Sequence, residues 1–354
     1  MNLNNLTDNN KPSRLGLADF LKGVAVVLMV QVHLMELFAT TAIQQSMAGK
    51  ISLFLGGPAA APLFMAVMGY FQARSAKTLH LRLRFGLKLI LWGFLLNIGL
   101  NAHLLLKIAN GSFKLDPWAY LFGVDILFLA GLSVIFITLF RHLVADKLFI
   151  WIILFAIVAF INPIIPVYSG PVSWIKYIEA YFWGYHSWSY FPFFPWLAYT
   201  LAGYVFGMQT KTSNNHFLSK ENIWLILSIA AIPMFIFFSF GFRVASNLSV
   251  YYHHSGWFVL WTISFLIVLM TLSRYLMKFA EKNLLIRLLK WMGQHVTAFY
   301  VFQWLIIGNV ATAVFQTMQW TGLILWFVLV MLTTSILVFL WEKLKRTIRA
   351  GSSQ

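Results

Sequence analysis

The most informative part of the chain is the stretch Asp19-Phe20-Leu21-Lys22-Gly23-Val24-Ala25-Val26-Val27-Leu28-Met29-Val30-Gln31-Val32-His33. It predicts an apolar helix with a cation near one end and an imidazole near the other. Lys22 and His33 are about three helical turns apart, so they share a face and lie roughly 16 Å apart along the axis. A charged or titratable side chain inside a lipid-spanning helix is costly and by default marks a functional site.

The composition is that of an integral membrane protein. Of the 354 residues, 60% are hydrophobic and 10% are charged, and the mean hydropathy is +0.77. A helix needs about 20 apolar residues to cross a hydrocarbon layer of about 30 Å. We therefore expect an all-α, polytopic helical bundle with about ten transmembrane spans. The expected spans are roughly 16–39, 51–73, 85–108, 117–140, 148–166, 190–209, 222–242, 255–273, 285–308 and 320–341.

The distribution of basic residues predicts the orientation in the membrane. The net charge of +16 would suggest nucleic acid in a soluble protein, but here most Lys and Arg residues flank the spans on one side. By the positive-inside rule both termini are cytoplasmic, no nucleic-acid partner is expected, and membrane lipids are the surrounding partners. The first span lacks a clear cleavage site after it, so we expect it to be retained. A bacterial inner membrane is the expected location.

One membrane domain accounts for nearly the whole chain. Residues 1–13 are polar and Asn-rich, and we expect a disordered cytoplasmic terminus there. The transmembrane domain covers 14–345, and 346–354 form a cytoplasmic tail. Residues 167–189 form an aromatic-rich outer loop, which is either an interfacial aromatic belt or a cap whose rings stack on a sugar. The sequence leaves a monomer and a homodimer open.

Several polar residues are expected at the depth of His33, in the outer half of the bundle. Glu36 lies three residues after His33 on the same helical face, where it can orient the imidazole. Such groups would each cost a few kcal/mol alone in hydrocarbon, so we expect them to face one another or water. Interhelical hydrogen bonding is the alternative role for each amide. The other catalytic candidates are Asn97, Asn101, Asp125 and Gln303.

Two further groups of candidates lie nearer the membrane surfaces. A basic rim on the cytoplasmic side would suit a polyphosphate such as the nucleotide of coenzyme A, although lipid head groups are alternative partners. Its members are Arg14, Lys22, Arg74, Arg82, Arg84 and Lys88. The candidate substrate-binding residues are Trp196, Tyr300, His253 and His254. The chain has no cysteine, no His, Asp and Glu set has metal-ligand spacing, and no metal is expected.

These motifs resemble a known enzyme superfamily. Asp-Phe-Leu-Lys-Gly at 19–23, with ten residues between Lys22 and His33, resembles the start of the bacterial transmembrane acyltransferases, in which Arg or Lys is followed after ten residues by His. Other segments are similar to the heparan-α-glucosaminide N-acetyltransferase-like branch, and they occur in the same order. These segments are 62–70, 122–127, 131–133, 190–199 and 293–303. Many relatives have Arg at the position of Lys22, so a bidentate phosphate clamp becomes a point charge.

The resemblance implies a membrane acyltransferase that uses acetyl-CoA or another acyl-CoA. The acyl group, most simply acetyl, would pass from the cytoplasmic donor to a hydroxyl or amine of an extracytoplasmic sugar or glycan. His33 would be the general base and Glu36 would orient it. Asn97, Asn101 or Gln303 would stabilise the oxyanion. A proton-coupled small-molecule transporter or flippase is the main alternative, because intramembrane His, Glu and Asp can also relay protons.

Overall fold

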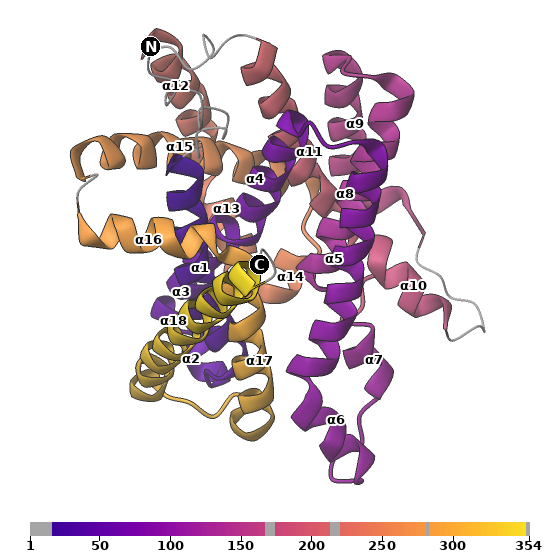
Figure 1. Cartoon of the computed structure of the whole chain (residues 1–354), viewed down its shortest axis with the longest axis vertical. Helices are drawn as coiled ribbons and strands as arrows, with labels where there is room; N and C mark the ends of the chain where they lie inside the picture. The colour runs from indigo at the N-terminus through magenta and orange to yellow at the C-terminus, as the bar shows by residue number, and fades with distance from the viewer. Residues whose placement is uncertain (1–15, 167–173, 213–219, 281–282, 352–354) are drawn as a thin grey trace.

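The computed structural model describes residues 16–166, 174–212, 220–280 and 283–351. Over these residues the chain is all-α, as expected, and contains isolated β-bridges but no strand. The expected disordered segment 1–13, Arg14 and residues 167–173 of the outer loop lie outside the described residues. The helices, shown in Figure 1, are α1 Gly16–Leu37, α2 Thr41–Gln45, α3 Met47–Ala59, α4 Ala61–Arg74, α5 Leu79–Leu100, α6 Ala102–Ala109, α7 Pro117–Leu121, α8 Ile126–Val144, α9 Leu148–Phe160, the 3₁₀ turn η1 Asn162–Ile164, α10 Ile175–Phe182, α11 Phe193–Thr212, α12 Lys220–Ile236, α13 Phe238–Ala245, α14 Leu248–Tyr252, α15 Gly256–Ala280, α16 Leu284–Gln294, α17 Val296–Val314 and α18 Trp320–Gly351.

Seven helical stretches in the described part of the chain are long and apolar enough to cross a membrane. An eighth is added if the pair 225–236 and 238–245, bent by 70°, counts as one span. The other two expected spans correspond to α9, which has 13 residues, and to α11, whose backbone is non-helical at Phe194. The polytopic membrane architecture is therefore confirmed, with fewer long straight helices than expected.

The expected span 285–308 is wrong, because the chain turns between two helices at His295. In Figure 1, α16 runs across the picture, whereas α17 runs down it. The sequence explains the break, since α16 carries Arg287 and Lys290 among its leucines and is amphipathic rather than uniformly apolar. An amphipathic helix of this kind is typical of a membrane surface. Only α17 from this region is a candidate span.

Glycines allow α1 to pack closely against α16. A Cβ atom added at Gly23 would lie 1.8 Å from the carbonyl oxygen of Leu289, and one added at Gly293 would lie 1.8 Å from that of Asp19. Only residues without a side chain permit such a backbone approach, which is common between helices in membranes. The same device joins α4 to α11 through Gly69 and Gly203. The N-terminal half of α1 is therefore held on a fixed support.

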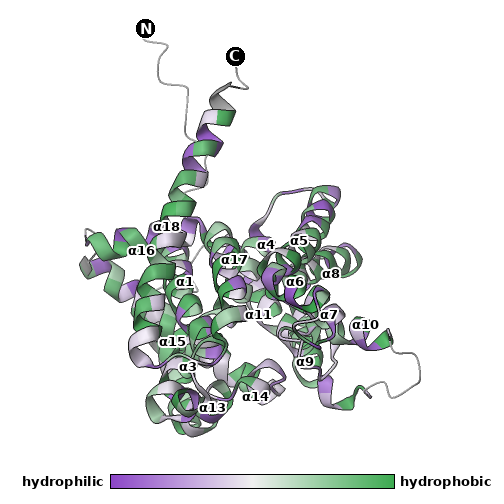
Figure 2. Ribbon diagram, turned by 90° about the horizontal axis from the view of Figure 1, so that it is seen from below, coloured by the Kyte–Doolittle hydropathy of each residue, from purple (hydrophilic) through white to green (hydrophobic). Residues whose placement is uncertain are grey.

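The outer surface of the bundle is strongly apolar. Figure 2 shows hydrophobic ribbon over most of the helices, with the more hydrophilic segments gathered mainly in loops and helix ends. Large exposed side chains line α5 and α18, among them Leu87, Leu91, Leu325 and Leu332. Such surface is unfavourable in water but suits contact with lipid. By contrast α1 is packed against α3, α4, α16, α17 and α18, which places His33 inside the protein.

Candidate active site

A largely apolar cavity lies along one face of α1. It has an empty volume of about 830 Å³, with the open space at its mouth included. Helix α1 contributes residues one, three and four positions apart, the spacing of a single helical face, and α17 and α4 supply other walls. From α1 the lining residues are Ala25, Val26, Met29, Val32 and His33. Lys22 lies on the same face, about one helical turn before Ala25 and Val26.

His33 is the imidazole of this cavity. Its side chain is 8% exposed, and its ring lies over the Trp304 indole with a centroid distance of 4.0 Å and a tilt of 34°. Its Nδ1 atom has no hydrogen-bond partner among the described residues. A buried polar atom without a partner costs free energy, so an unpaired nitrogen in a histidine that lines a cavity indicates a place for a ligand.

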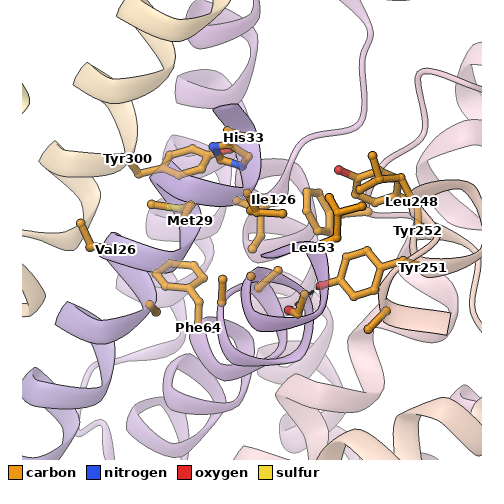
Figure 3. A pocket seen from close by; sticks show the side chains of 18 of the residues that line it. Val26, Met29, His33, Leu53, Phe64, Ile126, Leu248, Tyr251, Tyr252 and Tyr300 are labelled. Atoms are coloured by element: carbon orange, nitrogen blue, oxygen red, sulfur yellow. Dashed lines mark hydrogen bonds between the residues drawn. The ribbon is translucent and has the colours of Figure 1, made fainter. Parts of the chain in front are cut away.

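Glu36 does not orient His33 as we expected from the sequence. Its carboxylate instead accepts a hydrogen bond of 2.7 Å from the hydroxyl of Tyr252, which lies in α14. Figure 3 shows Tyr252 and Tyr251 on one side of the cavity, with His33 and Tyr300 on the other. The three-residue spacing places Glu36 on the same general side of α1 as His33, but tertiary packing gives it a different partner.

Asp125 and Tyr300 are brought together from distant parts of the chain. The Tyr300 hydroxyl donates a hydrogen bond of 2.6 Å to Asp125 Oδ2, and both side chains are buried. The other carboxylate oxygen of Asp125 accepts from the backbone N–H of Leu127 and so caps α8. The Tyr300 ring points toward His33 in Figure 3. Tyr300 therefore lines the cavity and is held by Asp125, which does not line it, while its contact with substrate stays a prediction.

The two asparagines have structural positions rather than the expected place at an oxyanion. Asn97 donates to the carbonyl oxygens of Leu121 and Gly123. Asn101 donates to the carbonyl oxygens of Asn97 and Tyr120. These bonds fix the turn that leads into α8, and neither amide lines the cavity.

Gln303 differs from the asparagines because its amide is not engaged. The side chain is fully buried, and neither its Nε2 nor its Oε1 atom has a hydrogen-bond partner among the described residues. It is not part of the cavity lining. The structure thus supports Gln303 as a buried polar residue near the site, without placing it at the reacting atoms.

The expected basic rim is only partly assembled. Lys22 Nζ forms an ion pair of 2.8 Å with Asp19 Oδ1, one turn earlier on α1. Arg74 donates to the Thr210 hydroxyl, and Arg82 donates to backbone carbonyl oxygens. Both Arg84 and Lys88 are exposed.

The two predicted substrate-binding histidines, His253 and His254, lie between α14 and α15 and have different surroundings. His254 Nε2 lies 2.9 Å from the Tyr199 hydroxyl and its Nδ1 lies 2.7 Å from the Tyr251 carbonyl oxygen, and burial lowers its pKa to about 4. His253 packs its ring at 4.9 Å from that of Tyr185, and burial lowers its pKa also. Neither lines the cavity, and their contact with substrate stays a prediction.

Trp196 is likewise a packing residue, because its indole is fully buried and donates to the Tyr252 carbonyl oxygen at 2.8 Å. Sequence reasoning missed Tyr252 and Trp304, which contact Glu36 and His33 respectively. Trp304 lies four residues after Tyr300, on the same helical face, and that spacing could have indicated it. No group of His, Asp and Glu able to hold a metal occurs within the described ranges.

These features define a multi-pass membrane protein with a histidine-containing cavity between its helices. The catalytic-domain family of heparan-alpha-glucosaminide N-acetyltransferase matches residues 14–238, more than half of the chain, and the chain belongs to this acetyltransferase family. The match includes His33, Glu36 and Asp125, whereas Tyr300 and Trp304 come from the part beyond it. No curated protein matches the chain, and no solved structure does. The family resemblance seen in the sequence is thereby confirmed.

Proposed function

We propose that the protein transfers an acetyl group from cytoplasmic acetyl-CoA to a hydroxyl or amine of an extracytoplasmic sugar or glycan, with His33 as general base. The observation that carries this proposal is the cavity, which follows one face of α1 from the level of Ala25 to His33, whose Nδ1 atom has no partner in the described part of the chain. Membership of the acetyltransferase family supports the reaction type. In a bacterial cell, the inner membrane would separate donor and acceptor in this way.

The reaction can be written with His33 as the only proton carrier. As the acceptor oxygen or nitrogen bonds to the thioester carbonyl carbon, the neutral imidazole takes the acceptor's proton. The C–S bond then breaks, and the imidazolium returns that proton to the departing CoA thiolate. General base catalysis of this kind is typically worth about 10² to 10⁴ in rate. Trp304, whose ring is packed against the imidazole at 4.0 Å, limits the orientations that the ring can adopt.

Tyr300 and Asp125 suit the binding of the acceptor. Because the Tyr300 hydrogen is donated to Asp125, the phenolic oxygen keeps lone pairs that can accept a hydrogen bond from a sugar hydroxyl or amine. A sugar hydroxyl or amine held near Tyr300 would also lie on the side of the cavity where His33 is found. The pair would therefore position the acceptor, while His33 removes its proton.

The donor would approach from the opposite end of the same face. Lys22 lies about one turn beyond the cavity lining of α1, and a phosphate of acetyl-CoA there would compete with Asp19 for the Lys22 ammonium. Arg74, Arg82, Arg84 and Lys88 remain candidates for the remaining phosphate charge. The acetyl thioester would then extend along the apolar wall toward His33.

The absence of cysteine from the chain permits a direct assay. Release of the CoA thiol can be followed with a thiol reagent, without background from the purified full-length protein. We expect thiol release from acetyl-CoA that depends on methyl α-D-glucosaminide or methyl α-D-glucoside as acceptor. We also expect acetyl-CoA at 100 times its Kd to stabilise the protein by about 2.7 kcal/mol.

The transporter alternative predicts another pattern. Stabilisation by the free sugar, with neither stabilisation nor thiol release from acetyl-CoA, would contradict the proposed function. Thiol release that is the same with and without any acceptor would contradict the assignment of a sugar as the acceptor.

A further inference from the structure

A second pocket lies between α16 and α18, away from the His33 cavity. It has an empty volume of about 880 Å³, including the open space at its mouth. Trp291 and Gln294 line it from α16, and Phe339, Lys343 and Arg346 line it from α18. Figure 2 shows α18 passing α16 before its last turns extend beyond the bundle. The pocket therefore sits where the long last helix leaves the apolar part of the molecule.

The charges around this pocket leave it positive. Glu342 is the carboxylate of the lining, and its Oε1 atom lies 2.5 Å from Lys345 Nζ. His295 Nε2 lies 3.8 Å from its other oxygen. One carboxylate therefore faces three cations, Lys343, Lys345 and Arg346. Since Lys345 already neutralises Glu342, the charges of Lys343 and Arg346 are available to an anion.

The lining changes from apolar to cationic along one face of α18. Phe339, Lys343 and Arg346 are four and three residues apart, so they follow one another on the same face over about 10 Å. The Phe339 side chain is 61% exposed and belongs to a candidate membrane span. A phospholipid matches this change from apolar to cationic lining, because its acyl chains lie in the hydrocarbon layer and its phosphate lies at the edge of that layer.

Helix α16 supports the same orientation. Its exposed Leu284 and Leu285 would contact hydrocarbon, while Trp291 carries an amphipathic indole of the kind enriched at membrane interfaces. Lipid chains and a phosphate group could therefore meet at the junction of the two helices. A free phosphate would use the cations but gain nothing from Phe339 and the leucines.

We propose that this pocket binds the phosphate head group of an anionic phospholipid, with Lys343 and Arg346 as its cationic contacts. The proposal does not depend on the acetyltransferase assignment, because it uses other residues on another face. Each cation near a membrane surface contributes about 1 kcal/mol to anionic lipid binding. Loss of both should weaken binding about 30-fold, which corresponds to about 2 kcal/mol.

The test uses the full-length protein in detergent, titrated with phosphatidylglycerol or phosphatidylcholine and read by native mass spectrometry. We expect one phosphatidylglycerol to be retained in preference to phosphatidylcholine, and the Lys343→Gln, Arg346→Gln double variant to lose that preference. The matched control, Lys147→Gln with Lys211→Gln, removes two exposed cations elsewhere and should keep it. Lys343→Arg with Arg346→Lys keeps both charges and should also keep it.

Three results would overturn the proposal. The first is equal retention of phosphatidylglycerol by the wild type and by a well-folded Gln double variant, judged by gel filtration. The second is displacement of the lipid by millimolar inorganic phosphate, which would assign the pocket to a free anion. Equal loss of preference in the Lys147 and Lys211 control would likewise contradict a specific site, because it would indicate general surface charge.

Discussion

The buried pair between Tyr300 and Asp125 allows a quantitative prediction. Tyr300→Phe removes only the hydroxyl that donates at 2.6 Å to Asp125 Oδ2, and it leaves the ring in the cavity wall. A hydrogen bond to a charged group is worth about 1.5–3 kcal/mol. If the acceptor is positioned through this hydroxyl, kcat/KM for the sugar should fall by about 10- to 150-fold. Thiol release from acetyl-CoA measures that loss.

The carboxylate side of the pair should behave as part of the same unit. Asp125→Asn keeps a side-chain oxygen to cap α8 at Leu127 N–H, because Asn caps helices about as well as Asp. Its amide, however, donates to Tyr300 instead of accepting from it. We therefore expect a similar loss of kcat/KM, with little loss of thermal stability. The double variant should be no worse than the more impaired single variant, since both changes remove one interaction.

Tyr251→Phe is the matched control for this cycle. Its hydroxyl donates at 2.8 Å to the Gly57 carbonyl oxygen in the same cavity and does not contact Asp125. The effect of Tyr251→Phe on kcat/KM should therefore multiply with that of Asp125→Asn. Multiplicative losses for Tyr300→Phe and Asp125→Asn would refute the reasoning, because they would show that the two groups act independently.

Two other predictions concern the N-terminal half of α1. Gly293→Ala would place a Cβ atom 1.8 Å from the Asp19 carbonyl oxygen, so it should destabilise the protein by about 1–3 kcal/mol through overpacking and lower its melting temperature. Gly322→Ala should leave the melting temperature unchanged, because a Cβ atom added there would meet only the flexible Met318 side chain, at 3.0 Å. Lys22→Gln should raise KM for acetyl-CoA about tenfold without changing kcat, whereas Asp19→Asn should lower it. An unchanged KM for Lys22→Gln would exclude Lys22 from donor binding.

The sequence predicts the membrane class and most of the helices because long apolar runs are a strong signal. It predicts less well where a helix lies in the membrane. The segment 285–308 is apolar on average, but Arg287 and Lys290 recur on one side of α16, and a hydropathy window cannot register that asymmetry. The turn at His295 then separates a surface-type helix from the span α17.

For the site, the sequence identifies His33 because an imidazole in an apolar helix is rare and costly. Partners that depend on distant segments could not be derived from spacing alone. Glu36 has the right helical offset from His33, yet Tyr252 of α14 takes its carboxylate. Likewise Asn97 reaches a comparable depth, but its amide bonds to the turn before α8. Depth along a span indicates which residues can meet, and packing decides which do.

The most direct test of the proposed mechanism is the rate of acetyl transfer by His33→Ala and His33→Gln. Both variants should bind acetyl-CoA with the wild-type thermal shift, because His33 lies at the far end of the cavity from Lys22. Their kcat should fall by about 10² to 10⁴ if the imidazole is the general base. A purified, folded His33→Ala protein that transfers acetyl groups within a few-fold of the wild-type rate would contradict the proposed role of His33.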